Sequence, residues 1–124
     1  MLVDFETGRE MDNVPYEETY ALTERMSADE FDAICAKLNS MIDRDLEEGR
    51  DIHTAGWMPG TDWTGTPFQP IYEKAARRNQ DLAARIFGLI VWKVFMDREE
   101  TWITGRFERD GEPIGSRTYF RSRT

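Results

Sequence analysis

The chain contains very little of two residue types that carry chemistry, with one cysteine and one histidine among 124 residues. The single cysteine, Cys35, cannot form an internal disulfide, so the sequence shows no adaptation to an oxidising compartment. It sits beside an apolar position of an expected helix and has no adjacent basic residue, which is typical of a small hydrophobic side chain. The single histidine excludes metal sites built on two imidazoles. We expect neither a metal nor a cofactor.

Long hydrophobic runs and nucleotide-binding loops are also missing. The most apolar stretch, 86–96, is interrupted by Lys93 and is shorter than the about 20 residues that cross a bilayer. The first residues lack the basic and apolar regions of a signal peptide. No GxGxxG or P-loop motif occurs, which excludes the standard phosphate-binding loops. These absences predict a cytoplasmic protein without membrane association.

Positive charge is scarce in the first part of the chain. Residues 1–52 hold 15 acidic and 5 basic residues, a net charge of −10, whereas residues 53–124 hold 9 acidic and 11 basic residues, a net charge of +2. The whole chain carries −8, which disfavours direct nucleic-acid binding. Two interpretations remain open: solvated faces of different charge, or an acidic surface that binds a basic protein partner.

Helix signals fill the middle of the chain. Ser27 and Glu30 have the spacing of a capping box, an apolar stripe of helical period follows, and Gly49 provides the stop, which predicts a helix over 28–48. Pro70 suits the first turn of a short helix. Asn79 or Asp81 can cap a longer helix that runs to Met96. This helix is apolar on nearly every side, as expected of a central core element or of a core element that also forms a subunit interface.

The C-terminal part has the pattern of a β-hairpin. Asp110-Gly111 is a strong turn signal between two segments of alternating character, 101–109 and 112–121. A two-residue turn pairs Arg109 with Glu112, Phe107 with Ile114, Ile103 with Thr118 and Trp102 with Tyr119.

The two faces of this hairpin differ in chemistry. We expect the first face to pack on the helices through Ile103, Phe107, Ile114 and Phe120. The second face then carries Trp102, Arg106, Arg117 and Tyr119. Guanidinium groups beside aromatic rings can hold an anion, although cross-strand support and protection of a sheet edge would use the same residues.

The expected fold class is α+β, with two or three helices packed on a small antiparallel sheet that includes the C-terminal hairpin. Two strands alone are marginal, and residues 2–5 are the natural source of a third. No linker, repeat or low-complexity tract divides the chain, so residues 1–124 form a single domain.

The segment 53–68 combines the only histidine with two tryptophans and a high density of glycine and proline. Such composition predicts a loop, and large aromatic groups in a loop either enter the core or line a site. The core alternative is favoured because the loop joins an acidic helix to the apolar one. In the other alternative, Trp57, Trp63 and Phe68 contact a planar ligand.

Catalysis would have to use His53, with Asp62 in the same loop to orient it. A histidine–aspartate pair is the orienting half of a nucleophilic triad, in which His53 is the general base. No serine or threonine lies in a recognisable nucleophile setting. A hydrogen bond from His53 to a backbone carbonyl, fixing the loop, is the favoured interpretation, and the chain is more typical of a non-enzyme.

Three functional hypotheses follow. The first is a small binding or interaction protein, a homodimer because of its apolar 82–96 segment and its Trp102 and Tyr119 face, with a site for an aromatic or anionic small molecule where the loop meets the hairpin. The second is a small hydrolase-like enzyme using His53 and Asp62. The third is an acidic inhibitor or immunity-type protein that masks a basic partner. The small size and missing catalytic signature are also typical of accessory cargo of phages or other mobile elements.

Overall fold

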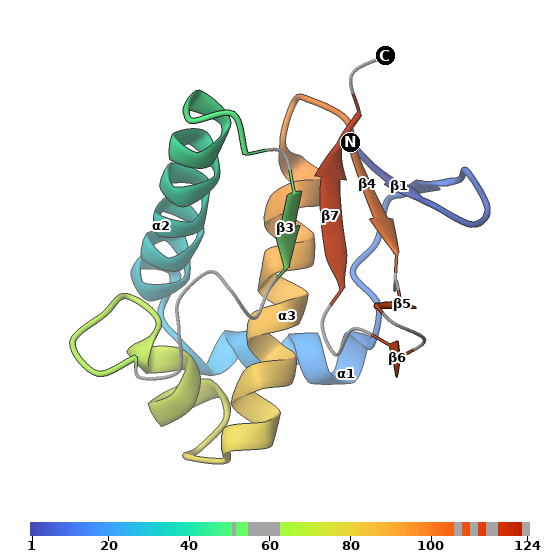
Figure 1. Ribbon diagram of the computed structural model, residues 1–124. Coiled ribbons are helices and arrows are strands. Elements are labelled where there is room, and N and C mark those ends of the chain that lie inside the picture. The colour runs from blue at the N-terminus through green and yellow to red at the C-terminus, as the bar shows by residue number, and fades with distance from the viewer. Residues whose placement is uncertain (51, 55–62, 106–107, 110–111, 114–116, 123–124) are drawn as a thin grey trace.

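The computed structural model describes residues 1–50, 52–54, 63–105, 108–109, 112–113 and 117–122. Helices and a five-stranded sheet form an α+β fold, which confirms the predicted class (Figure 1). The helical elements are α1 (Glu17–Tyr20), the 3₁₀ turn η1 (Ala21–Arg25), α2 (Ala28–Glu47), the π-helical turn η3 (Ile71–Ala75) and α3 (Gln80–Asp97). The strands are β1 (Leu2–Asp4), β2 (Glu10–Met11), β3 (Ile52–Thr54), β4 (Trp102–Gly105), β5 (Glu108–Arg109), β6 (Glu112–Pro113) and β7 (Thr118–Arg121).

The main sheet has the strand order β2-β1-β4-β7-β3. All of its neighbours are antiparallel except β1 and β4, which are parallel, so the sheet is mixed rather than wholly antiparallel. The chain leaves β1, forms the helical layer and returns through α3 to β4, and such a crossover connection is what parallel neighbours require. The N-terminal segment thus supplies a strand, as expected, and that strand lies inside the sheet.

Both long helices follow their local signals. The Ser27 hydroxyl accepts from the Glu30 amide, and the Glu30 carboxylate accepts from the Ser27 amide, as the capping box predicts. The Asn79 side chain caps α3 by accepting from the Leu82 amide. Gly49 ends the region of α2 with φ of +82°, a conformation that glycine adopts without strain.

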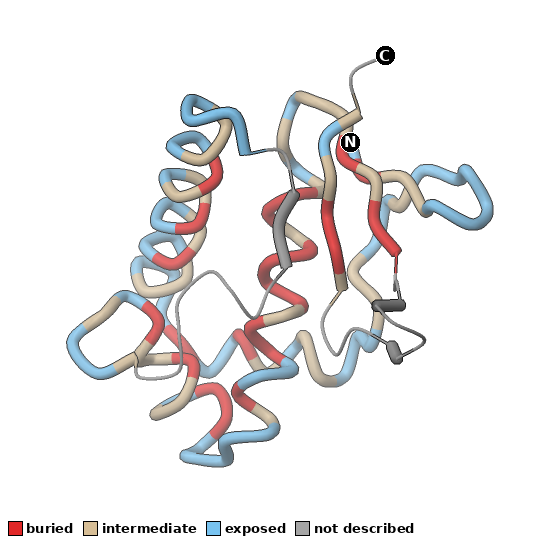
Figure 2. The backbone as a smooth tube through the Cα atoms, in the orientation of Figure 1, coloured by how far each residue is buried: buried red, intermediate tan, exposed pale blue. Residues whose placement is uncertain are grey.

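Helix α3 is the centre of the core. It lies behind β3 and β7, with α2 beside it (Figure 1). Nine of its residues are buried, which confirms the interpretation of an almost wholly apolar helix. Buried residues run along α3, along one side of α2 and through the lower parts of β4 and β7 (Figure 2). The apolar surface of α3 is therefore buried within one chain.

The hairpin register changes along its length. Arg109 pairs with Glu112 as predicted, but Ile103 pairs with Phe120 and Trp102 with Arg121, so the expected partners Thr118 and Tyr119 were wrong. Two residues separate β4 from β5, whereas four separate β6 from β7. This difference shifts the pairing by two positions, which an expectation of uninterrupted pairing from the turn misses.

The face assignment was also wrong. Trp102 and Tyr119 point to the core, with 0% and 1% of their surfaces exposed, while Ile103 and Phe120 on the other face remain partly exposed. Burying an indole and a phenol ring removes more apolar area from water than burying an isoleucine. The larger rings therefore occupy the helix-facing side.

Candidate functional site

The described part of the aromatic loop packs on α3. The Trp63 ring lies 5.3 Å from the Phe87 ring and 6.3 Å from the Phe68 ring, centroid to centroid, and Phe68 meets Phe87 edge-on at 5.5 Å. Phe68 is buried and Trp63 is partly exposed. These contacts favour the interpretation in which the loop aromatics enter the core. Trp57 lies outside the described residues, so its role stays a prediction.

The proposed catalytic pair is only partly described. The backbone of His53 belongs to β3 and stands opposite Tyr119 in the ladder with β7. Asp62 lies outside the described residues. The pairing of these two side chains, and with it the hydrolase hypothesis, stays a prediction.

Trp102 and Tyr119 form an aromatic stack with Phe95 of α3. The Phe95 and Tyr119 rings are nearly parallel at 4.3 Å, and Trp102 meets Phe95 edge-on at 4.7 Å. Sequence reasoning placed both residues on a ligand-binding face, whereas both rings are enclosed by the protein. The stack fixes the sheet on α3, and neither ring is presented to a ligand at the surface.

Arg117 does lie beside an aromatic ring, although not one of those expected. Its guanidinium carbon is 4.8 Å from the centre of the Trp92 ring, a cation–π distance. Trp92 belongs to α3, is 3% exposed and donates its indole N–H to the backbone oxygen of Asn13 at 3.2 Å. Arg106, the other predicted arginine, lies outside the described residues.

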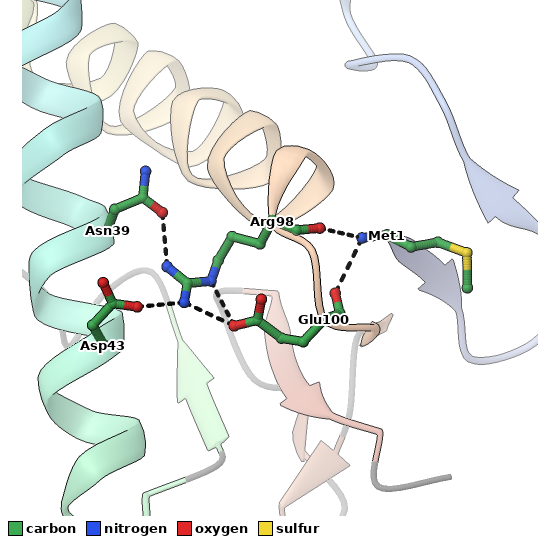
Figure 3. Close-up of polar contacts among 5 residues, drawn as sticks. All are labelled: Met1, Asn39, Asp43, Arg98 and Glu100. Carbon is green, nitrogen blue, oxygen red and sulfur yellow. Dashed lines mark hydrogen bonds and ion pairs between the residues drawn. The ribbon is translucent and has the colours of Figure 1, made fainter.

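A second withdrawn arginine was not foreseen from the sequence. Arg98 follows α3, and its side chain is 12% exposed. Its guanidinium donates to Asn39 at 2.8 Å, to Asp43, and to Glu100 at 2.8 and 2.7 Å (Figure 3). The amino group of Met1 donates to the backbone oxygens of Arg98 and Glu100 at 2.6 and 3.1 Å. The cluster joins α2, the end of α3 and the start of the sheet.

In this cluster, Arg98 and Glu100 each stabilise the charged form of the other. Burial opposes the charge on Arg98, but hydrogen bonds to Asp43 and Glu100 outweigh it and raise the pKa of the guanidinium above its ordinary value. Burial likewise opposes the charge on Glu100, yet the hydrogen bond from Arg98 leaves the pKa of this carboxyl below its ordinary value. Because Arg98 donates to side-chain oxygens of Asn39, Asp43 and Glu100 on two different elements, the cluster is structural in character.

Cys35 has the environment of an unreactive thiol. It is half-buried on α2, and burial, followed by the charges of Asp32 and Asp97, raises the pKa of the thiol to about 11. The thiolate is the reactive form of cysteine, so this thiol is almost wholly protonated at neutral pH. The prediction of a small hydrophobic role agrees with that environment.

The outer sheet face was missed as a candidate surface. We use this name for Val3, Phe5, Ile103 and Phe120, on the side of the sheet away from α3. Val3 pairs with Ile103, and Ile103 pairs with Phe120, so three partly exposed apolar residues form one row across β1, β4 and β7. Phe5 is 58% exposed and meets Phe120 edge-on at 6.2 Å. The apolar side chains of segment 2–5 were the available signal.

Several kinds of site are missing from the part of the chain that the structure describes. No three carboxylate, thiol or imidazole groups gather there in a way that could hold a metal ion. Over the same residues, no helix has the length and apolarity needed to cross a bilayer. No protein-family model, curated protein or solved structure matches this chain.

Proposed function

We propose that this protein is a small interaction protein that works as a homodimer through its outer sheet face. The observation that carries the proposal is the row formed by Val3, Ile103 and Phe120 together with the exposed ring of Phe5. Contiguous apolar surface on a sheet is costly to leave in water and marks interaction sites. The sequence suggested a homodimer on other grounds, namely α3 and the Trp102 and Tyr119 face, and both of those are buried within one chain.

Charge favours a second copy as the occupant of this face. Two chains that each carry −8 repel one another, least where the local net charge is smallest. The three strands of the row, β1, β4 and β7, contain one acidic residue, Asp4, and one basic residue, Arg121. Helix α2 contains six acidic and two basic residues. A like-charged copy therefore approaches most easily over the sheet.

The geometry also suits self-pairing. A two-fold axis along the central strand β4 stacks β1 of each copy over β7 of the other, so that the same apolar row is used twice. Two sheets packed face to face form the layer arrangement of a β-sandwich, with side chains of both faces interdigitating.

Sedimentation velocity over a micromolar to millimolar range tests the proposal. The wild-type chain should show a reversible monomer–dimer equilibrium that salt leaves unchanged or strengthens, since apolar contacts are not screened. Phe5→Glu should weaken the dimer by at least about tenfold, because it places a charge in the apolar contact. Tyr16→Glu is the matched control, since Tyr16 is the most exposed aromatic residue described, at 76%, and lies outside the row. A strictly monomeric wild type, or equal effects of the two substitutions, would overturn the proposal.

The exposed side of α2 favours a second candidate function, the masking of a basic partner. Asp29, Asp32, Asp43 and Glu47 are all exposed along this helix. Charge-driven association of this kind weakens with salt, unlike association through the outer sheet face. Titration with a polylysine peptide over a salt series tests it, and charge reversal at Asp29 and Asp32 should weaken any binding seen.

A further inference from the structure

Arg117 occupies an environment that differs from those of the other arginines whose side chains are described. All of these arginines other than Arg98 and Arg117 are exposed. Arg98 is withdrawn from water with side-chain acceptors on three residues. Arg117 is partly buried and packs over Trp92, and within the described part of the chain it has no carboxylate partner. Arginine is rarely withdrawn from water without an acceptor for its charge.

The guanidinium of Arg117 lies over the Trp92 ring and makes no hydrogen bond or ion pair with the described residues. A guanidinium that lies over an indole uses its flat face, while its five N–H groups point outward in its own plane. Trp92 is held rigidly beneath it, since the indole is 3% exposed and its N–H is bonded to Asn13. An anion that binds Arg117 would meet a donor that is already positioned, which lowers the entropic cost of binding.

Unsatisfied polar groups lie at the same end of the sheet. Thr118 follows Arg117 directly, and Thr104 stands opposite the next residue, Tyr119. Both threonine hydroxyls are buried without a hydrogen-bond partner. Because side chains alternate along a strand, Thr104 shares the α3-facing side of the sheet with Tyr119, whereas Thr118 lies on the opposite side with Phe120. Buried hydroxyls normally find a partner, so the unpaired Thr104 hydroxyl is polar capacity on the same side of the sheet as Trp92 and Arg117 that the described residues do not use.

We infer that Arg117 is the anchor of a binding site for a carboxylate ligand, with Trp92 as its platform. A planar carboxylate accepts two parallel hydrogen bonds from one guanidinium and matches its single charge, whereas a doubly charged phosphate calls for additional cations. The opposite face of the guanidinium can also stack on a ring, so an aromatic carboxylate fits better than an aliphatic one. The inference does not depend on self-association, because the outer sheet face lies on the other side of the sheet from Trp92.

The test uses benzoate as the probe and the Trp92 indole N–H as the reporter in proton–nitrogen NMR, assigned by its loss in Trp92→Phe. Benzoate should produce saturable shifts of that signal, and the uncharged analogue benzamide should not. Arg117→Gln should weaken benzoate binding by at least about tenfold, and Arg117→Lys should weaken it less, because an ammonium keeps the charge but loses the paired geometry. Arg121→Gln is the control and should leave binding unchanged, because Arg121 is an exposed arginine at the other end of β7.

Each other outcome overturns the inference. No saturable shift in the wild type at millimolar benzoate would remove the site, as would unchanged binding in folded Arg117→Gln. Equal responses to benzoate and benzamide would show that the carboxylate is not recognised. Tighter binding of inorganic phosphate than of benzoate would remove the assigned ligand class. Far-ultraviolet circular dichroism of every variant establishes that each is folded.

Discussion

Arg98 and Arg117 lie at opposite ends of the α3–sheet contact and differ in how their guanidinium groups are used. Arg98 is surrounded by acceptors on Asn39, Asp43 and Glu100, and its hydrogen bonds join α2 to the segment between α3 and the sheet. Arg117 packs against Trp92 and makes no hydrogen bond with the described residues. A buried charge whose hydrogen-bond acceptors lie within the protein has a structural role, whereas one without such acceptors is a candidate for binding a ligand.

The largest expected difference between the structural role of Arg98 and the binding role of Arg117 is in the free energy of unfolding after each guanidinium is removed. Arg98→Ala leaves the mostly buried Glu100 without its cation, and should lower the free energy of unfolding by about 3 kcal/mol. Arg117→Ala loses a cation–π contact and should cost about 0.5–1 kcal/mol. Urea denaturation measures both. Similar losses at the two positions would break the comparison.

Acid should weaken the Arg98 cluster selectively. Folding lowers the pKa of Glu100, so its contribution to stability is complete above the pKa of an unfolded glutamate, about 4.3, and is lost as the pH falls through the folded value. The unfolding free energy of the wild type should therefore fall more steeply below about pH 5 than that of Glu100→Gln. Glu99→Gln, the exposed neighbour, is the control and should keep the wild-type slope. Parallel profiles for wild type and Glu100→Gln would contradict the role given to Arg98.

Among the exposed arginines, Arg77 and Arg78 form a third class, in which backbone conformation rather than charge determines the effect of a substitution on stability. Arg77 and Arg78 end the η3 region with φ of +48° and +65°, a left-handed conformation that costs a side-chain-bearing residue energy. Arg77→Gly should therefore raise the free energy of unfolding by about 0.5–1 kcal/mol. Arg85→Gly, at an exposed position inside α3, should lower it by about 1 kcal/mol. Thermal unfolding compares the two, and a loss in both would show that the Arg77 side chain makes contributions beyond its backbone.

Local signals made the helices and the turn pairing predictable. The Ser27 capping box, the Asn79 cap and the Arg109–Glu112 pair each depend on residues within a few positions of one another. The fold class followed from the order of these elements.

The faces of the hairpin depend on a distant element. Each face of the hairpin carries apolar residues, so the local pattern fits either orientation, and the rings of Trp102 and Tyr119 pack on Phe95 of α3 in the core. The same holds for the two arginines. Arg98 finds acceptors 59 and 55 residues earlier in the chain, and Arg117 finds a ring on α3. Pairings of this kind carry no periodic signal, so the site residues were only partly recognised.

The position of β1 inside the sheet has a consequence for how the chain acquires its structure. Leu2 pairs with Trp102, 100 positions later, and β4 in turn pairs with β7 at the far end of the sequence. During synthesis, β1 can pair early with β2, but its pairing with β4 has to wait until about 100 further residues have been made, while α2 and α3 can form from local contacts. The aromatic stack between α3 and the sheet therefore forms late, and the helices of the nascent protein form before the sheet that they pack against.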